Sequence, residues 1–178
     1  MTLEEDRAAA QRETIASPFQ SGVMQIEPGW IDYNGHLNMA YYNVLFDRAI
    51  DEMWAELGIG PDYLKSRGCS TFTAECHVRY LREVQLGDPV RVDVYLIQAD
   101  DKRLHTFEEL RHAEGGWLSA TSENMSVHVD MSLRKAAPFP ADIRAGIDRV
   151  VTAHAAVPRP EGIGRSVAMP TGRASVRS

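Results

Sequence analysis

The sequence predicts an α+β fold in which an antiparallel sheet wraps around one long central helix, followed by a C-terminal helix and a tail. Three observations carry this prediction: one long stretch with helical periodicity, four later stretches that alternate apolar and polar residues, and short turn sequences between them. A helix with an apolar stripe needs a sheet face to cover it, and the later strands supply that face.

Length and composition indicate one globular domain. The chain has 178 residues, of which 44% are hydrophobic and 25% charged, enough to build one buried core. We expect the domain to occupy residues 18–156, between a flexible arm at residues 1–17 and a tail at residues 157–178 that is rich in Pro, Gly and Arg.

Charge and hydropathy exclude several kinds of partner. The formal net charge of −6 disfavours nucleic acid. No run of 18 apolar residues is present, and the acidic N-terminal segment lacks the basic and apolar regions of a secretion signal. We therefore expect a soluble, cytoplasmic protein with no membrane partner.

The two cysteines, Cys69 and Cys76, lie in one predicted strand. Their Cα atoms would be roughly 23 Å apart, whereas a disulfide requires less than about 7 Å. No CxxC motif or nearby histidine cluster indicates zinc. We expect free thiols and no metal or cofactor.

The first elements are a short strand at residues 21–27, stopped by Pro28-Gly29, and a long helix at residues 38–57. The helix is predicted from apolar residues spaced by three and four, and Gly58 and Gly60-Pro61 end it. Its expected stripe is Tyr42, Leu45, Phe46, Ala49, Ile50, Met53, Trp54 and Leu57. Residues 61–68 add one short turn.

Four antiparallel strands are predicted next, as a meander over residues 71–80, 90–96, 102–113 and 117–131. The polar residues 121–124 interrupt the last strand, which predicts a bulge or a rim position there. A closing helix follows within residues 138–156, with Ile143, Ile147, Val150 and Val151 as its stripe. Composition favours a flexible tail after it.

The loop before the long helix carries a carboxylate, an amide and an imidazole: Asp32, Asn34 and His36. Free backbone N–H groups and the positive end of the helix dipole favour negative charge there. The same groups suit the oxyanion of a tetrahedral acyl intermediate, an interaction worth about 2.7 to 4 kcal/mol per donor. A helix cap requires only one acceptor, so the set of three predicts a catalytic site.

This segment resembles the hotdog-fold thioesterases of the 4-hydroxybenzoyl-CoA thioesterase-like superfamily, and the resemblance covers about residues 21–137. The matching residues are Asp32, Gly35, Tyr42, Phe46 and Asp47. The resemblance implies a hotdog fold and hydrolysis of an acyl-CoA to free acid and coenzyme A. It implies that Asp32 attacks the thioester carbonyl or activates water, while the backbone N–H of Met39 polarises the carbonyl.

Asn34 and His36 are similar to residues of the plant acyl-carrier thioesterases, in which Asp, Asn and His have the same spacing. By this resemblance His36 is a base or orients water, and Asn34 holds Asp32 or the thioester. The whole sequence also resembles the thioesterases of carnitine breakdown, which implies betainyl-CoA as substrate. Four aromatic residues near the loop could hold its quaternary ammonium by cation–π attraction, although core packing would also explain some of them. They are Trp30, Tyr33, Tyr41 and Tyr42.

The phosphates of coenzyme A require cations, for which Arg103, Arg134 and Arg165 are candidates; solvated surface charge is the alternative for each. Because a single hotdog unit has exposed strand edges, we expect a homodimer or higher homo-oligomer with sites at the interface. A hotdog hydratase or dehydratase fits less well, since its motif places Asp and His five positions apart with a proline after the Asn. Here Asp32 and His36 are four apart. A non-catalytic binding module would be expected to lack Asp32.

Overall fold

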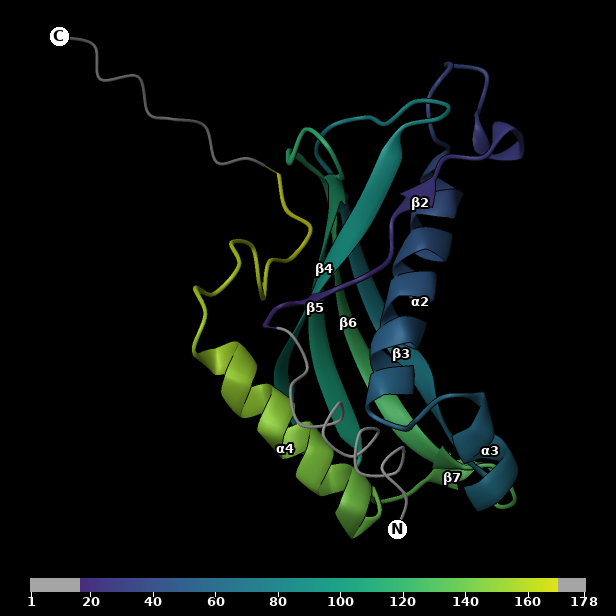
Figure 1. Cartoon of the computed structure of the whole chain (residues 1–178), viewed down its shortest axis with the longest axis vertical. Helices are drawn as coiled ribbons and strands as arrows, with labels where there is room; N and C mark the ends of the chain where they lie inside the picture. The colour runs from purple at the N-terminus through teal and green to yellow at the C-terminus, as the bar shows by residue number, and fades with distance from the viewer. Residues whose placement is uncertain (1–16, 170–178) are drawn as a thin grey trace, which may run out of the picture.

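The computed structural model describes residues 17–169, which form a curved antiparallel sheet wrapped around the helix α2 (Figure 1). The elements are β1 (Phe19–Gln20), β2 (Met24–Gln25), the 3-10 helix η1 (Pro28–Trp30), α2 (Met39–Glu56), α3 (Pro61–Arg67), β3 (Cys69–Tyr80), β4 (Pro89–Ala99), β5 (Arg103–His112), β6 (Leu118–Asp130), β7 (Lys135–Ala136) and α4 (Ala141–Ala155). The strand order is β1-β4-β5-β6-β3, with β2 beside β4 and β7 beside β6. The predicted α+β architecture is confirmed.

The long helix lies within one residue of its predicted bounds. Asn38 precedes it and caps it, because the Asn38 side chain accepts a hydrogen bond of 3.0 Å from the Ala40 N–H. Leu45, Ala49 and Met53 on its inner face are fully buried. The opposing core residues are Val90, Val92, Val94 and Leu96 of β4, as the alternation predicted. The core therefore lies between α2 and the concave face of the sheet.

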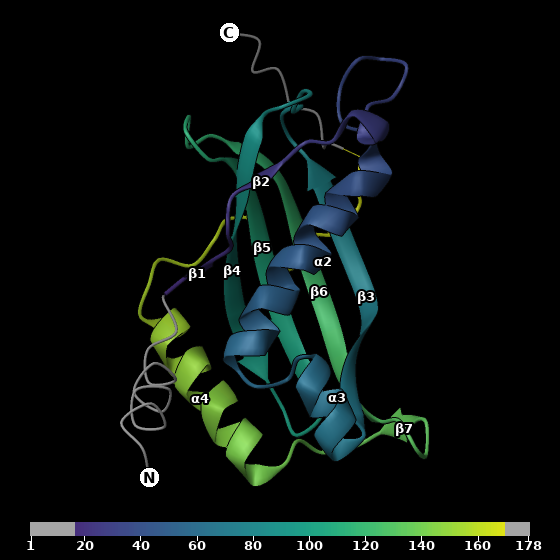
Figure 2. The same cartoon turned by 45° about the vertical axis from the view of Figure 1, so that its right-hand side comes forward.

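The predicted four-strand meander is wrong in one respect. β3 pairs with β6 at the far edge, so only β4, β5 and β6 are consecutive neighbours. Residues 81–88 carry the chain from β3 at one edge of the sheet across to β4 on its other side (Figure 2). Alternation determines which face a side chain occupies but does not determine which strand lies next to it.

The polar residues 121–124 form neither a bulge nor a rim. Ser122 pairs with Val78 of β3 on one side and Glu108 of β5 on the other, so this segment crosses the middle of the sheet. The bulge of β3 lies instead between Thr73 and Glu75. The first predicted strand, residues 21–27, is also corrected: only β2 lies within it, β1 precedes it, and Val23 between the two is 63% exposed.

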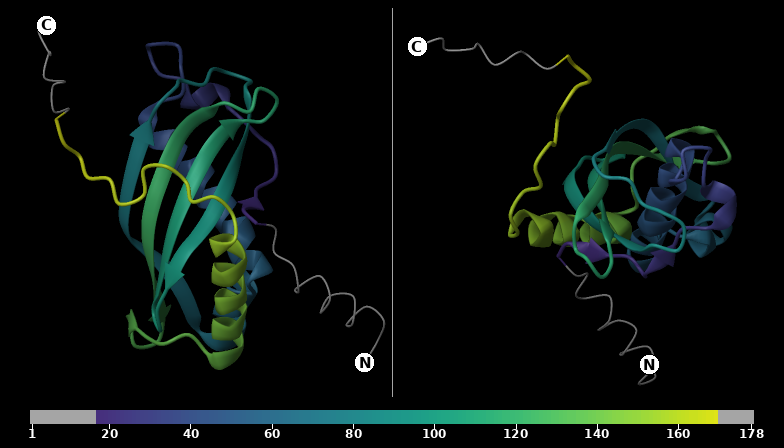
Figure 3. Two further views of the ribbon diagram at one scale, coloured as in Figure 1. Left: turned by 90° about the vertical axis from the view of Figure 1, so that its left-hand side faces the viewer. Right: turned by 90° about the horizontal axis from the view of Figure 1, so that it is seen from above.

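Residues 157–169 cross the outer face of the sheet, and α4 lies along its β4 side (Figure 3). α4 buries Ile143, Ile147 and Val150, which confirms the closing helix. The Gly164 N–H donates to both carboxylate oxygens of Glu123, at 3.0 and 2.8 Å. Composition predicted flexibility for the tail, whereas this described part of it has a defined place on the sheet.

Candidate active site

The loop that carries Asp32 is closed by an isolated bridge between Ile31 and Leu37. The Leu37 N–H donates to the Val84 carbonyl at 3.0 Å, and the Asn38 N–H donates to the Trp30 carbonyl at 2.9 Å. These bonds fix both ends of the loop beside the first turn of α2. The loop is visible above the start of that helix (Figure 2).

Asp32 is half-buried, and its side chain forms an Asx turn. Its Oδ1 accepts a 2.8 Å hydrogen bond from the Asn34 N–H, and its own N–H donates to the His36 carbonyl at 3.1 Å. Asn38, not Asp32, caps α2. Among the described residues Asp32 Oδ2 has no hydrogen-bond partner, so this oxygen is available to a substrate or water.

The first helical N–H, that of Met39, is also available. Asn38 satisfies the next one, Ala40, and no acceptor for Met39 lies within residues 17–169. The Met39 carbonyl accepts a 3.2 Å bond from the Tyr80 hydroxyl, which connects the start of α2 to the edge strand β3. An unpartnered N–H at the positive end of an 18-residue helix can stabilise an oxyanion.

His36 is half-buried and its Nδ1 lies 3.3 Å from the Leu37 carbonyl oxygen. A carbonyl only accepts, so this geometry is satisfied when Nδ1 carries the hydrogen, and Nε2 is then free to take a proton. Asn34 is exposed. The structure thus brings Asp32, Asn34 and His36 into one loop.

The four aromatic candidates do not form one cage within the chain. Trp30 is buried, stacks on Tyr41 with a centroid distance of 5.5 Å, and has the Arg48 guanidinium 5.0 Å from its ring. Tyr42 is buried against the edge of Tyr80, and this burial raises the pKa of Tyr42. Tyr33 is 97% exposed.

The three arginine candidates lie away from Asp32 within one chain. Arg103 pairs with Asp100 at 3.0 Å in the turn between β4 and β5, and Arg134 lies in the turn between β6 and β7. That end of the sheet is separated from the Asp32 end by the length of β4, about 33 to 37 Å. Arg165 follows Gly164 on the outer face.

Sequence reasoning missed a cavity of about 340 Å³ between α2 and the inner face of the sheet. It is lined by Asn43 and Asp47 of α2, Cys76 of β3, Glu108 of β5, and Ser122 and Asn124 of β6. Two polar contacts cross it: Cys76 Sγ lies 3.8 Å from Asn43 Oδ1 and 3.6 Å from Ser122 Oγ. It begins one helical turn beyond Met39, about 6 Å along α2.

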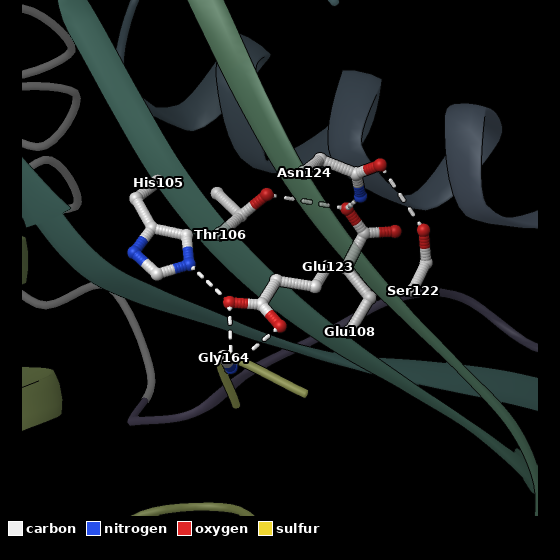
Figure 4. Close-up of polar contacts among 7 residues, drawn as sticks. All are labelled: His105, Thr106, Glu108, Ser122, Glu123, Asn124 and Gly164. Carbon is white, nitrogen blue, oxygen red and sulfur yellow. Dashed lines mark hydrogen bonds and ion pairs between the residues drawn. The ribbon is translucent and has the colours of Figure 1, made fainter. Parts of the chain in front are cut away.

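Glu108 is only 1% exposed in this cavity. Its Oε1 accepts hydrogen bonds from Asn124 Nδ2 at 2.7 Å and Thr106 Oγ1 at 3.4 Å, whereas Oε2 is buried with no partner (Figure 4). Desolvation raises the pKa of Glu108 to about 8, and the nearby charge of Asp47 adds to the shift. The adjacent acids in "FEEL" were the available signal, because one of two consecutive strand residues must face the helix.

A larger hollow of about 630 Å³ lies between the end of α2, α3 and α4. Arg67 and Asp142 form an ion pair in its wall, with Nη1 and Oδ1 2.9 Å apart. It is separated from Asp32 by the length of α2, about 27 Å. Neither hollow contains three His, Cys, Asp or Glu side chains placed to hold a metal ion, nor does any other site within residues 17–169.

Residues 26–147 match the sequence profile of the Thioesterase-like superfamily. The chain belongs to this superfamily. The thioesterase is 39% identical over 143 residues to a betainyl-CoA thioesterase of Pseudomonas aeruginosa, covering 80% of this chain and 90% of that protein.

Two solved structures agree with this assignment. A Staphylococcus aureus protein in complex with CoA has a TM-score of 0.80 and 28% identity, covering 88% of this chain and 98% of that one. A putative thioesterase of Pseudomonas putida KT2440 has a TM-score of 0.75 and 32% identity, covering 88% and 99%. The hotdog fold and the acyl-CoA thioester hydrolase family are confirmed. No helix of the described chain has the length and apolarity to cross a membrane.

Proposed function

We propose that this thioesterase hydrolyses betainyl-CoA to betaine and coenzyme A, with Asp32 as the catalytic carboxylate. The observation that carries the proposal is the position of Asp32, whose free Oδ2 belongs to the closed loop that leads directly to the unpartnered Met39 N–H. A carboxylate and an oxyanion donor at one helix start are the two groups that acyl transfer requires.

In the proposed reaction the thioester carbonyl oxygen accepts the Met39 N–H. Asp32 either attacks the carbonyl carbon or takes a proton from a water that attacks it. The carbon–sulfur bond then breaks and the thiolate of coenzyme A leaves, taking up a proton. If Asp32 attacks, water hydrolyses the resulting anhydride. His36, with Nε2 able to accept a proton, is placed to act as a base or to orient the water.

The choice of betainyl-CoA is supported by the similarity to the Pseudomonas aeruginosa enzyme. A screen that measures thiol release over betainyl-CoA, benzoyl-CoA and straight-chain acyl-CoAs tests it. We expect betainyl-CoA to have the highest kcat/KM. Equal or faster hydrolysis of the other acyl-CoAs would reject betainyl-CoA as the preferred substrate, and a change in enoyl-CoA absorbance without thiol release would indicate a hydratase.

The edge strand β3 leads us to expect a homodimer. It is the last strand of the sheet, and its Phe72 and Tyr80 are 46% and 43% exposed. A 12-residue unpaired edge is usually covered in a stable protein, and a second copy of the same edge would cover it. Sedimentation at micromolar concentration should give at least a dimer, and a monomer would contradict the expectation.

Deleting residues 157–178 tests whether the tail binds the nucleotide end of coenzyme A. If Arg165 contacts the substrate phosphates, the deletion should raise KM for acyl-CoA several-fold with little change in kcat, because only ground-state binding is lost. Arg165→Ala in the full chain is the matched single-residue variant. An unchanged KM in both would remove the tail from the substrate site.

A further inference from the structure

The cavity that contains Glu108 has an acidic lining with no positive group. Asp47 from α2 and Glu108 from β5 both line it, and none of its lining residues is Lys, Arg or His. The remaining polar groups are amides, hydroxyls and one thiol, that of Cys76. The Glu108 carboxyl is left incompletely hydrogen-bonded, because its Oε2 is buried and has no partner within the described residues.

A neutral alkyl group could pack against the apolar side chains that also line this cavity, those of Val44, Phe46 and Ile50. It would leave Glu108 Oε2 without a partner, however, and unpaired buried polar groups are costly. A quaternary ammonium has no N–H to donate, but its charge interacts favourably with carboxylates over several ångströms.

The spacing along α2 suits a short acyl group. Asn43 and Asp47 lie about 6 and 12 Å along the helix from Met39. In a betainyl group the nitrogen lies two bonds from the carbonyl carbon, about 2.5 Å away as in a peptide backbone. A carbonyl oxygen held at the Met39 N–H lets the ammonium reach the Asn43 end of the cavity at most, so its charge acts on Glu108 and Asp47 through space.

We propose that the cavity bearing Glu108 and Asp47 is the subsite for a cationic acyl group, with these two carboxylates determining substrate choice. The proposal rests on the proposed function, since it takes the reacting carbonyl to lie at Met39 and Asp32. Glu108 acts here as a specificity residue and takes no part in the bond-breaking step.

The proposal also predicts proton release on binding. Desolvation keeps the Glu108 carboxyl largely protonated near neutral pH, and the groups facing it are Asp47 from α2 and Cys76 from β3. A bound cation stabilises the carboxylate form, so the Glu108 O–H loses its proton to the solvent. A neutral isostere of the same shape would cause no such release.

Two substrates of nearly equal shape test the subsite: betainyl-CoA, and 3,3-dimethylbutyryl-CoA, in which carbon replaces the ammonium nitrogen. We expect the wild type to favour betainyl-CoA at least tenfold in kcat/KM. Glu108→Gln and Asp47→Asn should each reduce that preference at least fivefold. Glu56→Gln removes an exposed charge near the end of the same helix and should leave the preference unchanged. If Glu108→Gln changes kcat/KM by the same factor for both substrates, the subsite proposal is wrong.

A binding measurement separates the subsite from the hydrolase activity. Calorimetry in two buffers with different ionisation enthalpies should show proton release when Asp32→Asn enzyme binds betainyl-CoA, and none with 3,3-dimethylbutyryl-CoA. Equal proton release for both ligands would overturn the subsite. If the wild type binds both ligands but hydrolyses no acyl-CoA, the proposed function fails instead. Hydrolysis of both at equal rates rejects the subsite and the preference for betainyl-CoA, but not the thioesterase activity.

Discussion

Asp32→Asn should lower kcat for thioester hydrolysis by roughly 10² to 10⁴, the range in which a positioned acid–base group contributes. Asn keeps an oxygen at Oδ1 that accepts the Asn34 N–H, so the Asx turn and the loop should survive the change. What the substitution removes is the negative charge and the ability to attack a carbonyl or to accept a proton. Thiol release measured under saturating substrate gives kcat directly.

This variant distinguishes a catalytic carboxylate from a structural one. If Asp32 served only the turn, Asn would replace it with little loss, and full activity in Asp32→Asn would remove Asp32 from the mechanism. Asp62→Asn is a suitable control, because Asp62 is an exposed acid in the first turn of α3, far from the site. Unchanged melting temperatures in both variants would show that any loss of activity is chemical.

The sequence was sufficient to predict α2 and the Asp32 loop because both depend on local signals. The helix is specified by spacing of three and four and by its Asn38 cap, and the loop by three polar side chains at a helix start. The neighbours of β3 depend on pairing across residues far apart in the chain, which alternation does not encode.

Glu108 was missed for a related reason. Both faces of β5 are covered, the inner one by α2 and the outer one by residues 157–169, which cross it (Figure 1 and Figure 3). Phe107, Glu108, Glu109 and Leu110 are consequently all buried. A strand covered on both faces loses the period-two contrast that marks inward positions. The cavity combines residues of α2, β3, β5 and β6, so no single stretch of sequence contains it.

Glu108→Gln should stabilise the free enzyme, and increasingly so as the pH rises. Folding raises the pKa of Glu108 from 4.5 to about 8, so between these values the folded state holds a proton that the unfolded state has lost. The proton-linked stability is therefore complete below about pH 4.5 and is lost as the pH rises through about 8. Gln is neutral throughout, and its amide oxygen can still accept from Asn124 Nδ2.

We expect the melting temperature of Glu108→Gln to exceed that of the wild type at pH 8 by at least about 2 to 4 °C, the shift that 1 kcal/mol causes in a chain of this size. The difference should narrow toward pH 5. Glu109→Gln is the matched control, since the neighbouring Glu109 faces outward and accepts a 2.7 Å bond from Arg111. Losing that pair should lower the melting temperature.

A higher melting temperature in Glu108→Gln and a lower one in Glu109→Gln would identify Glu108 as a carboxylate that reduces stability. Such a cost is the usual sign of a residue retained for function. When both proteins also carry Asp32→Asn, adding betainyl-CoA should then give the enzyme with Glu108 a higher melting temperature than the Glu108→Gln variant. A cation in the cavity stabilises the folded carboxylate but gives nothing to the amide. If Glu108→Gln lowers the melting temperature at every pH, the Glu108 carboxyl supports the fold, and the cavity is part of the structural core.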